Sequence, residues 1–165
     1  ARPAPATQPK DVKPDSIIVD MDLDRTIEFY VNQLGGRLLD KTKDEGPHLG
    51  TYVFGPGKQD RASLGIAMVE LGGIEIEFIQ YLDPPTAVSY HGDPSRAGSG
   101  HLAWEVDDIE GMYNQLKASG VRFHSPVNDC IRDGVLVWKW VYFRDPDNMC
   151  VEMTQRFKSY LADKK

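Results

Sequence analysis

The spacing of apolar residues in the first half of the chain predicts a strand, a helix and then further strands. A β-rich run at 16–19 is followed by an acidic turn at 20–24. A helix is expected next, because apolar residues recur every three or four positions, at Leu23, Ile27, Tyr30, Val31 and Leu34. Gly35 and Gly36 end this helix, and Asp22 or Asp24 is well placed to cap its start.

Alternating apolar positions predict four strands after this helix. Gly72 and Gly73 predict a tight hairpin turn between the last two of them. The four strands are expected at 37–43, 48–54, 63–71 and 74–81.

The second half of the chain repeats this order of elements. Its helical stripe consists of Ile109, Met112, Tyr113 and Leu116, and Gly120 ends it. Strands are expected at 101–106, 121–124, 135–144 and 149–155, with a turn at 145–148 and a short terminal helix at 157–162. Each half is therefore interpreted as a βαβββ module, with one additional strand in the first half.

The repeat is also visible in the residues themselves. The strand and turn at 15–24 correspond to 101–110 at a constant offset of 86 positions. A second pair of similar segments, 76–80 and 151–155, closes the two halves. Internal repeats of this kind indicate two similar modules packed together, which brings one polar residue from each first strand to an equivalent place.

The chain divides accordingly into two modules and three connecting or terminal segments. A segment rich in proline and glycine separates the modules and lacks periodicity. The expected divisions are a disordered arm at 1–14, a first module at 15–82, a linker at 83–99, a second module at 100–156 and a C-terminal tail at 157–165.

Composition excludes several classes of partner. The 165 residues are 41% apolar and 27% charged, and the net charge of −6 comes without any block of lysine or arginine. This charge distribution argues against nucleic acid, and no apolar run approaches the roughly 20 residues of a membrane span. The two cysteines, Cys130 and Cys150, lack a CxxC spacing and are interpreted as one buried thiol and one loop thiol in a reducing compartment. We therefore expect a cytoplasmic protein with a small-molecule partner.

Several segments resemble the vicinal oxygen chelate superfamily, which includes glyoxalase I, methylmalonyl-CoA epimerase, extradiol dioxygenases and bleomycin-resistance proteins. The matching stretches are 21–30, 33–36, 100–108 and 143–147. The resemblance is nearest to glyoxalase I and methylmalonyl-CoA epimerase. It implies an α+β fold in which two tandem βαβββ modules form an open curved barrel around a cleft, and it implies a homodimer.

The resemblance also implies a divalent metal ion held by one residue from the first and last strands of each module. Transferred to this sequence, the ligands are Asp15, Glu77, His101 and Glu152. Histidine and carboxylates suit zinc, nickel, cobalt, manganese or iron, and the sequence does not distinguish among them. Asp15 departs from the usual histidine or glutamine, and direct ligation, ligation through water and a structural role all remain open. Glu75, two residues from Glu77, could exchange roles with it.

Three functions fit this resemblance. The preferred one is a metal-dependent lyase or isomerase in which the metal stabilises an enediolate and Glu152 or Glu77 is the catalytic base. An extradiol-type dioxygenase with ferrous iron is the second, although that class uses two histidines and one carboxylate and only His101 occupies a ligand position. The third is a metal-free binding or resistance protein. Trp138, Trp140 and Tyr142 share one face of a strand and are interpreted as core, dimer interface or substrate wall.

Overall fold

The computed structural model describes residues 15–57, 61–86 and 95–157. The expected arm at 1–14 and most of the expected terminal helix lie outside these ranges, as does the centre of the expected linker. The elements in chain order are β1 (Asp15–Asp20), α1 (Leu23–Ile27), η1 (Glu28–Gln33), β2 (Arg37–Gly46), α2 (Pro47–Phe54), β3 (Ala62–Leu71), β4 (Ile74–Asp83), β5 (Leu102–Glu105), α3 (Ile109–Ala118), β6 (Arg122–Phe123), β7 (Asn128–Arg132), β8 (Val135–Arg144) and β9 (Cys150–Arg156).

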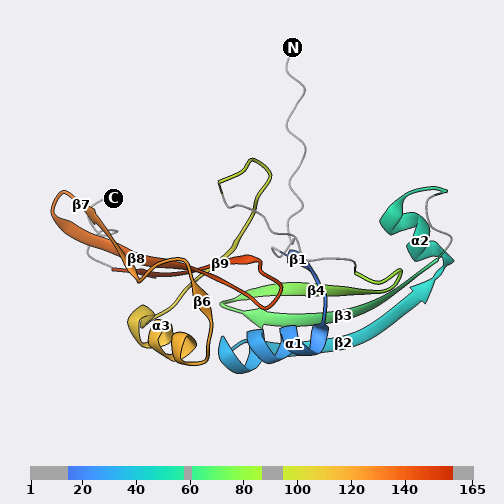
Figure 1. Cartoon of the computed structure of the whole chain (residues 1–165), viewed down its shortest axis with the longest axis horizontal. Helices are drawn as coiled ribbons and strands as arrows, with labels where there is room; N and C mark the ends of the chain where they lie inside the picture. The colour runs from blue at the N-terminus through green and yellow to red at the C-terminus, as the bar shows by residue number, and fades with distance from the viewer. Residues whose placement is uncertain (1–14, 58–60, 87–94, 158–165) are drawn as a thin grey trace, which may run out of the picture.

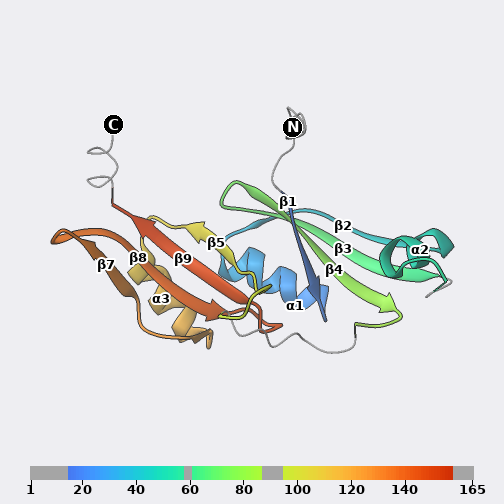
Figure 2. The same ribbon diagram turned by 90° about the horizontal axis from the view of Figure 1, so that it is seen from above.

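These elements form two sheets with the same topology. The first has the order β1-β4-β3-β2 and the second the order β5-β9-β8-β6, with β7 also paired to β8. In both sheets the first strand runs parallel to the last strand of its module, while the other pairs are antiparallel. The predicted α+β fold with two βαβββ repeats is thus confirmed. The sheets are curved and lie side by side without closing into a barrel (Figures 1 and 2).

Hydrogen bonds at the two helix starts follow the repeat residue by residue. Asp22 caps α1 and Asp108 caps α3, each accepting bonds from backbone N–H groups of the first turn. Gln80 accepts from the Leu23 N–H, and Gln155 accepts in the same way from the N–H of Ile109. Each glutamine therefore ties the start of a helix to the last strand of the same module.

The core lies between the sheets and the helices beneath them. The helical segment α1–η1 packs on β3 and β4, and α3 packs on β9. Figure 1 shows both helical segments on one side of the sheets, so the opposite sheet faces point the same way. The largest fully buried side chains are Tyr30, Phe78, Phe143, Ile76, Ile109, Leu116, Met153, Val69, Val137, Val141, Val151 and Thr26. Their alternation along the strands leaves the other face of each sheet open.

Two elements differ from the sequence-based expectation. The segment at 48–54 forms helix α2 rather than a strand, because Gly46, at φ 151°, breaks β2 and Pro47 starts the helix with a fixed φ. Strand β7 was not expected; it extends the second sheet by pairing with β8. Cys130 lies in β7 and Cys150 in β9, so neither cysteine is the expected loop thiol. The predicted turn at Gly72–Gly73 is confirmed, with φ values of 61° and 85° that favour glycine.

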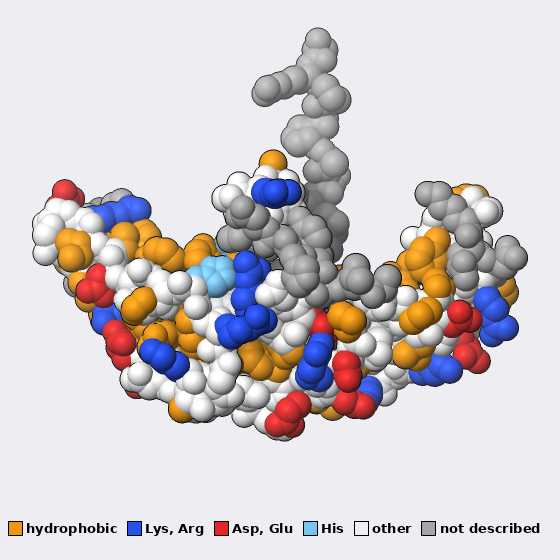
Figure 3. All heavy atoms as spheres, viewed as in Figure 1, with side chains coloured by type: hydrophobic (Ala, Val, Ile, Leu, Met, Phe, Trp, Pro, Cys, Tyr) orange, Lys and Arg blue, Asp and Glu red, His pale blue; other side chains and the backbone are white. Residues whose placement is uncertain are grey.

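No helix among the described residues is long and apolar enough to cross a membrane. The open side of the molecule carries hydrophobic side chains over both sheets (Figure 3). On β1, Ile17 is 64% exposed and Val19 is 50% exposed. Two alternate apolar residues on the same strand face are thus left without cover.

Candidate functional site

His101 and Glu152 form a side-chain pair on the open face of the second sheet. His101 directly precedes β5, and Glu152 lies in β9 opposite Ala103. The His101 Nε2 atom lies 3.0 Å from Glu152 Oε2. The side chains of His101 and Glu152 are 38% and 16% exposed, so the pair is open to a ligand. Two of the four predicted ligands are therefore neighbours.

The first sheet places the other two predicted ligands at matching positions. Glu77 in β4 lies opposite Ile17 in β1, as Glu152 lies opposite Ala103. Asp15 precedes Ile17 by two residues, as His101 precedes Ala103. The register of both sheets thus places Asp15 and Glu77 where the other module has His101 and Glu152. Glu77 is half-buried and takes part in other interactions.

The side chain of Asp15 lies outside the described part of the structure, and the other predicted ligands do not form a three-residue metal cluster within that part. Within 15–57, 61–86 and 95–157, no three His, Cys, Asp or Glu side chains lie close enough together to hold a metal ion. The imidazole nitrogen of His101 and the carboxylate of Glu152 are donors that suit zinc and related divalent cations. Two donors make only part of a metal site, since zinc sites in proteins usually have three or four protein ligands.

Tyr142 completes the surroundings of the His101–Glu152 pair. Its ring meets that of His101 edge to face at 5.3 Å between centroids. Burial raises the pKa of the Tyr142 hydroxyl, and the negative charge of Glu152 raises it further. The hydroxyl therefore keeps its proton at neutral pH. Sequence reasoning left Tyr142 open as core, dimer interface or substrate wall, and its register opposite Glu152 now places it beside this pair.

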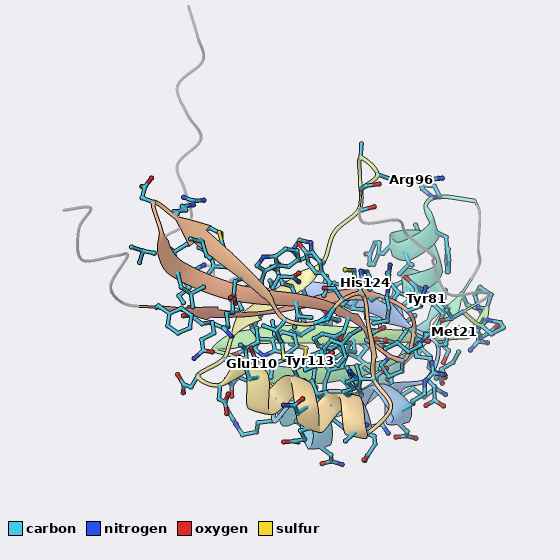
Figure 4. All side chains as sticks on the ribbon, turned by 60° about the vertical axis from the view of Figure 1, so that its left-hand side comes forward. Met21, Tyr81, Arg96, Glu110, Tyr113 and His124 are labelled. Carbon is cyan, nitrogen blue, oxygen red and sulfur yellow. The ribbon has the colours of Figure 1, made fainter. Side chains whose placement is uncertain are left out.

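His48, His124 and the two cysteines belong to no group of three metal-type side chains among the described residues, and His91 lies outside those residues. Burial lowers the pKa of His124, and nearby Arg144 lowers it further (Figure 4 labels His124). His48 is half exposed, with its Nε2 atom 4.0 Å from Asp44. Cys130 and Cys150 are both free thiols. Burial raises the pKa of the Cys150 thiol, which opposes formation of a reactive thiolate.

A second polar cluster joins the two modules on the helix side. The Tyr30 hydroxyl donates to Asp145 Oδ2 at 3.0 Å, and Arg25 forms an ion pair with Asp147. The Met21 N–H also donates to Asp147 Oδ2, at 3.1 Å. Sequence analysis treated the segment at 145–148 only as a turn. These contacts show that its aspartates hold the first module against the second.

Asp20 lies in this contact region between the two modules, the seam, where the surroundings are unfavourable for a carboxylate. It is 1% exposed, and neither of its carboxyl oxygens has a hydrogen-bond partner among the described residues. Burial raises its pKa from 3.8 to about 8, with further contributions from Asp145 and Asp147. A signal for this position was present in the repeat, because the equivalent residue 86 positions later is the apolar Val106.

Comparison with known proteins establishes the family. The sequence model of the Glyoxalase/Bleomycin resistance protein/Dioxygenase superfamily matches residues 13–153. The chain belongs to this superfamily, and the resemblance seen in the sequence is confirmed.

Individual relatives agree with this placement. The lactoylglutathione lyase of Schizosaccharomyces pombe is 27% identical over 142 residues, which cover 82% of this chain and 44% of that protein. The chain thus spans less than half of the curated relative it matches. A glyoxalase family protein from Bacillus cereus superimposes with a TM-score of 0.77 at 21% identity, covering 93% of this chain and 99% of that one. For the trypanothione-dependent glyoxalase I of Leishmania major the TM-score is 0.57 at 20% identity, covering 91% and 88%. At these identities the two structures support the fold alone.

Proposed function

We propose that this member of the superfamily is a divalent-metal-dependent lyase or isomerase that moves a proton on a small oxygen-bearing substrate. The observation that carries the proposal is the 3.0 Å pairing of His101 with Glu152 on the open face of the second sheet. The matching register of Asp15 and Glu77 supports it, as does the likeness to a lactoylglutathione lyase.

Each residue has a definite part in this proposal. His101 and Glu152 would hold the cation from one module, and Glu77 and Asp15 would hold it from the other. The bound cation supplies Lewis-acid polarisation of the substrate's oxygen atoms. Glu152 takes the proton from the carbon beside the substrate carbonyl and returns it to a neighbouring atom. Tyr142 keeps its proton and stands next to Glu152, so it can donate a hydrogen bond to a substrate oxygen.

We further propose that the complete site forms between two copies of the chain. Among the described residues of one chain no three metal-type side chains gather, and Ile17 and Val19 on one face of β1 are exposed. A twofold dimer places the first module of each copy opposite the second module of the other, which yields two equivalent sites. Closure of the two open faces also removes exposed apolar surface from water.

The first test measures metal content and proton exchange together. Protein purified without a histidine tag is expected to contain about one divalent metal ion per chain by elemental analysis. In deuterium oxide, NMR is expected to show deuterium at the carbon next to the carbonyl in at least one of a panel of hemithioacetal, thioester and keto-acid substrates. Oxygen consumption with ferrous iron and no exchange would identify a dioxygenase instead. Absence of both metal and turnover would leave a binding protein.

The second test is complementation between two inactive variants. His101→Ala disables the second module and Glu77→Ala the first, so each homodimer should be inactive. The two proteins are then mixed in equal amounts under conditions that exchange subunits. About half of the dimers become mixed, and each mixed dimer has one site built from two unaltered modules. Activity is therefore expected to reach about one quarter of the wild-type value. Mixing of either variant with itself is the control. If the mixture stays inactive although an affinity tag on one variant co-purifies the other, the site lies within one chain.

A further inference from the structure

A cavity of about 510 Å³ lies on the open face of the second sheet. Glu152 lines one part of it and Arg156 another, four residues further along β9. At about 3.3 Å per residue this separation is roughly 13 Å, and the cavity volume is typical of small-molecule sites. The cavity therefore extends from the His101–Glu152 pair along the strand and has room for more than the reacting atoms.

Two aromatic side chains line the part of the cavity away from His101. Trp138 lies opposite Arg156 in the register of β8 and β9, and Phe157 follows Arg156. The Phe157 N–H donates to the Val137 carbonyl at 3.0 Å, which fixes the backbone beside Trp138. Trp138 and Phe157 are only half-buried, so aromatic surface remains available to a ligand.

In this part of the cavity the positive side chain of Arg156 is paired with the negative side chain of Glu105, so no strong net charge faces a ligand. The Arg156 Nε atom lies 4.0 Å from Glu105 Oε2, and the Arg156 N–H donates to Glu105 Oε1 at 3.2 Å. The Arg132 guanidinium stacks on the Trp138 ring at 4.8 Å from its centroid, which holds the indole in place. A neutral flat ring suits such a surface better than a second charged group, because aromatic faces and edges favour stacked or edge-on ring contacts.

We infer that the cavity takes an uncharged aromatic ring attached to the substrate's metal-binding oxygens, with Trp138 as the residue that selects for the ring. The inference rests on the proposed function, because it names the substrate class of that site. The preferred substrates are aryl-substituted α-oxo compounds rather than their methyl-substituted analogues. Trp138 acts on specificity and takes no part in the proton transfer.

The experiment compares two α-oxo carboxylates that differ in the substituent alone. Phenylglyoxylate and pyruvate present the same pair of neighbouring oxygens, and calorimetry measures the affinity of each for the full chain, with and without zinc. Phenylglyoxylate is expected to bind at least about tenfold more tightly, since one stacked ring contact is worth roughly that factor. Trp138→Ala should reduce this preference to less than about threefold, and Trp138→Phe should restore part of it.

Trp140→Ala is the matched control. Trp140 is two residues further along the same strand, packs on Tyr142 at 5.2 Å and is not part of the cavity lining. This variant should keep the preference for phenylglyoxylate, and circular dichroism should show that all three variants remain folded. Equal affinity for both probes, binding of neither, or a preference that survives Trp138→Ala overturns the inference. A zinc-independent preference in a protein without bound metal would instead support the ring site and contradict the proposed function.

Discussion

If the proposed site is right, His101→Ala is expected to remove most of the bound metal and to lower turnover by at least about a thousandfold, because it deletes the one imidazole among the proposed ligands and leaves Glu152 without its 3.0 Å neighbour. Elemental analysis of the purified variant and a rate measurement on the substrate found by proton exchange provide the two readouts. The fold should survive, since His101 is partly exposed and lies outside the buried core.

Two further variants separate loss of metal from loss of the base. Glu152→Gln keeps a donor oxygen but loses basicity, so metal content should fall modestly while turnover falls steeply. His48→Ala is the matched control, because His48 lies on α2 in the other module, near Asp44. It should change neither readout. Full metal occupancy and full rate in His101→Ala would place the site elsewhere in the chain.

The fold could be predicted from the sequence because its signals are local and repeated. Polar helix caps at Asp22 and Asp108, glycine stops and alternating strands recur in both halves, and the tandem modules agree with each other. The segment at 48–54 was predicted wrongly because its apolar residues fit a strand as well as a helix over so short a length. The break at Gly46 and the start at Pro47 decided between the two.

The site was predictable only in part. The resemblance pointed to His101 and Glu152, and strand register brings these two side chains together, while their role as ligands stays a prediction. Whether Glu77 and Asp15 complete the same site depends on how the modules meet, in the proposed dimer across two copies of the chain, and no local pattern encodes that. The contact of Tyr142 with His101 likewise depends on pairing between strands far apart in sequence.

The seam between the modules was missed for a different reason. Asp20 resembled part of an acidic turn, and acidic turns are normally solvated. The fold instead buries it beside Asp145 and Asp147, where only long-range packing determines its environment. The burial of Asp20 is expected to have a large effect on the free energy of unfolding rather than on catalysis.

We expect the free energy of unfolding to fall as the pH rises from about 4 to about 8, with Asp20 as a main cause. The pKa of Asp20 is raised from 3.8 in the unfolded chain to about 8 in the folded one, so the folded state binds the proton more tightly. The favourable contribution of its protonated form is complete below the unfolded pKa and is lost as the pH rises through the folded pKa. Each unit of pKa difference corresponds to about 1.4 kcal/mol, so the loss amounts to several kcal/mol.

Asp20→Asn is therefore expected to raise the free energy of unfolding at pH 8 by roughly 1–3 kcal/mol, because the amide stays neutral where the carboxyl must ionise. This net gain already includes the cost of burying an amide whose hydrogen bonds are not all satisfied. Urea unfolding at pH 5, 6.5 and 8 measures the change, and the slope of stability against pH should flatten in the variant.

Asp107→Asn is the control, because it changes an exposed carboxyl and should leave the slope of stability against pH as it is. Asp145→Asn should destabilise the fold instead, since Asp145 accepts hydrogen bonds from the Tyr30 hydroxyl and the Met149 N–H. An unaltered slope in Asp20→Asn would show that other carboxyls set the pH dependence of this seam.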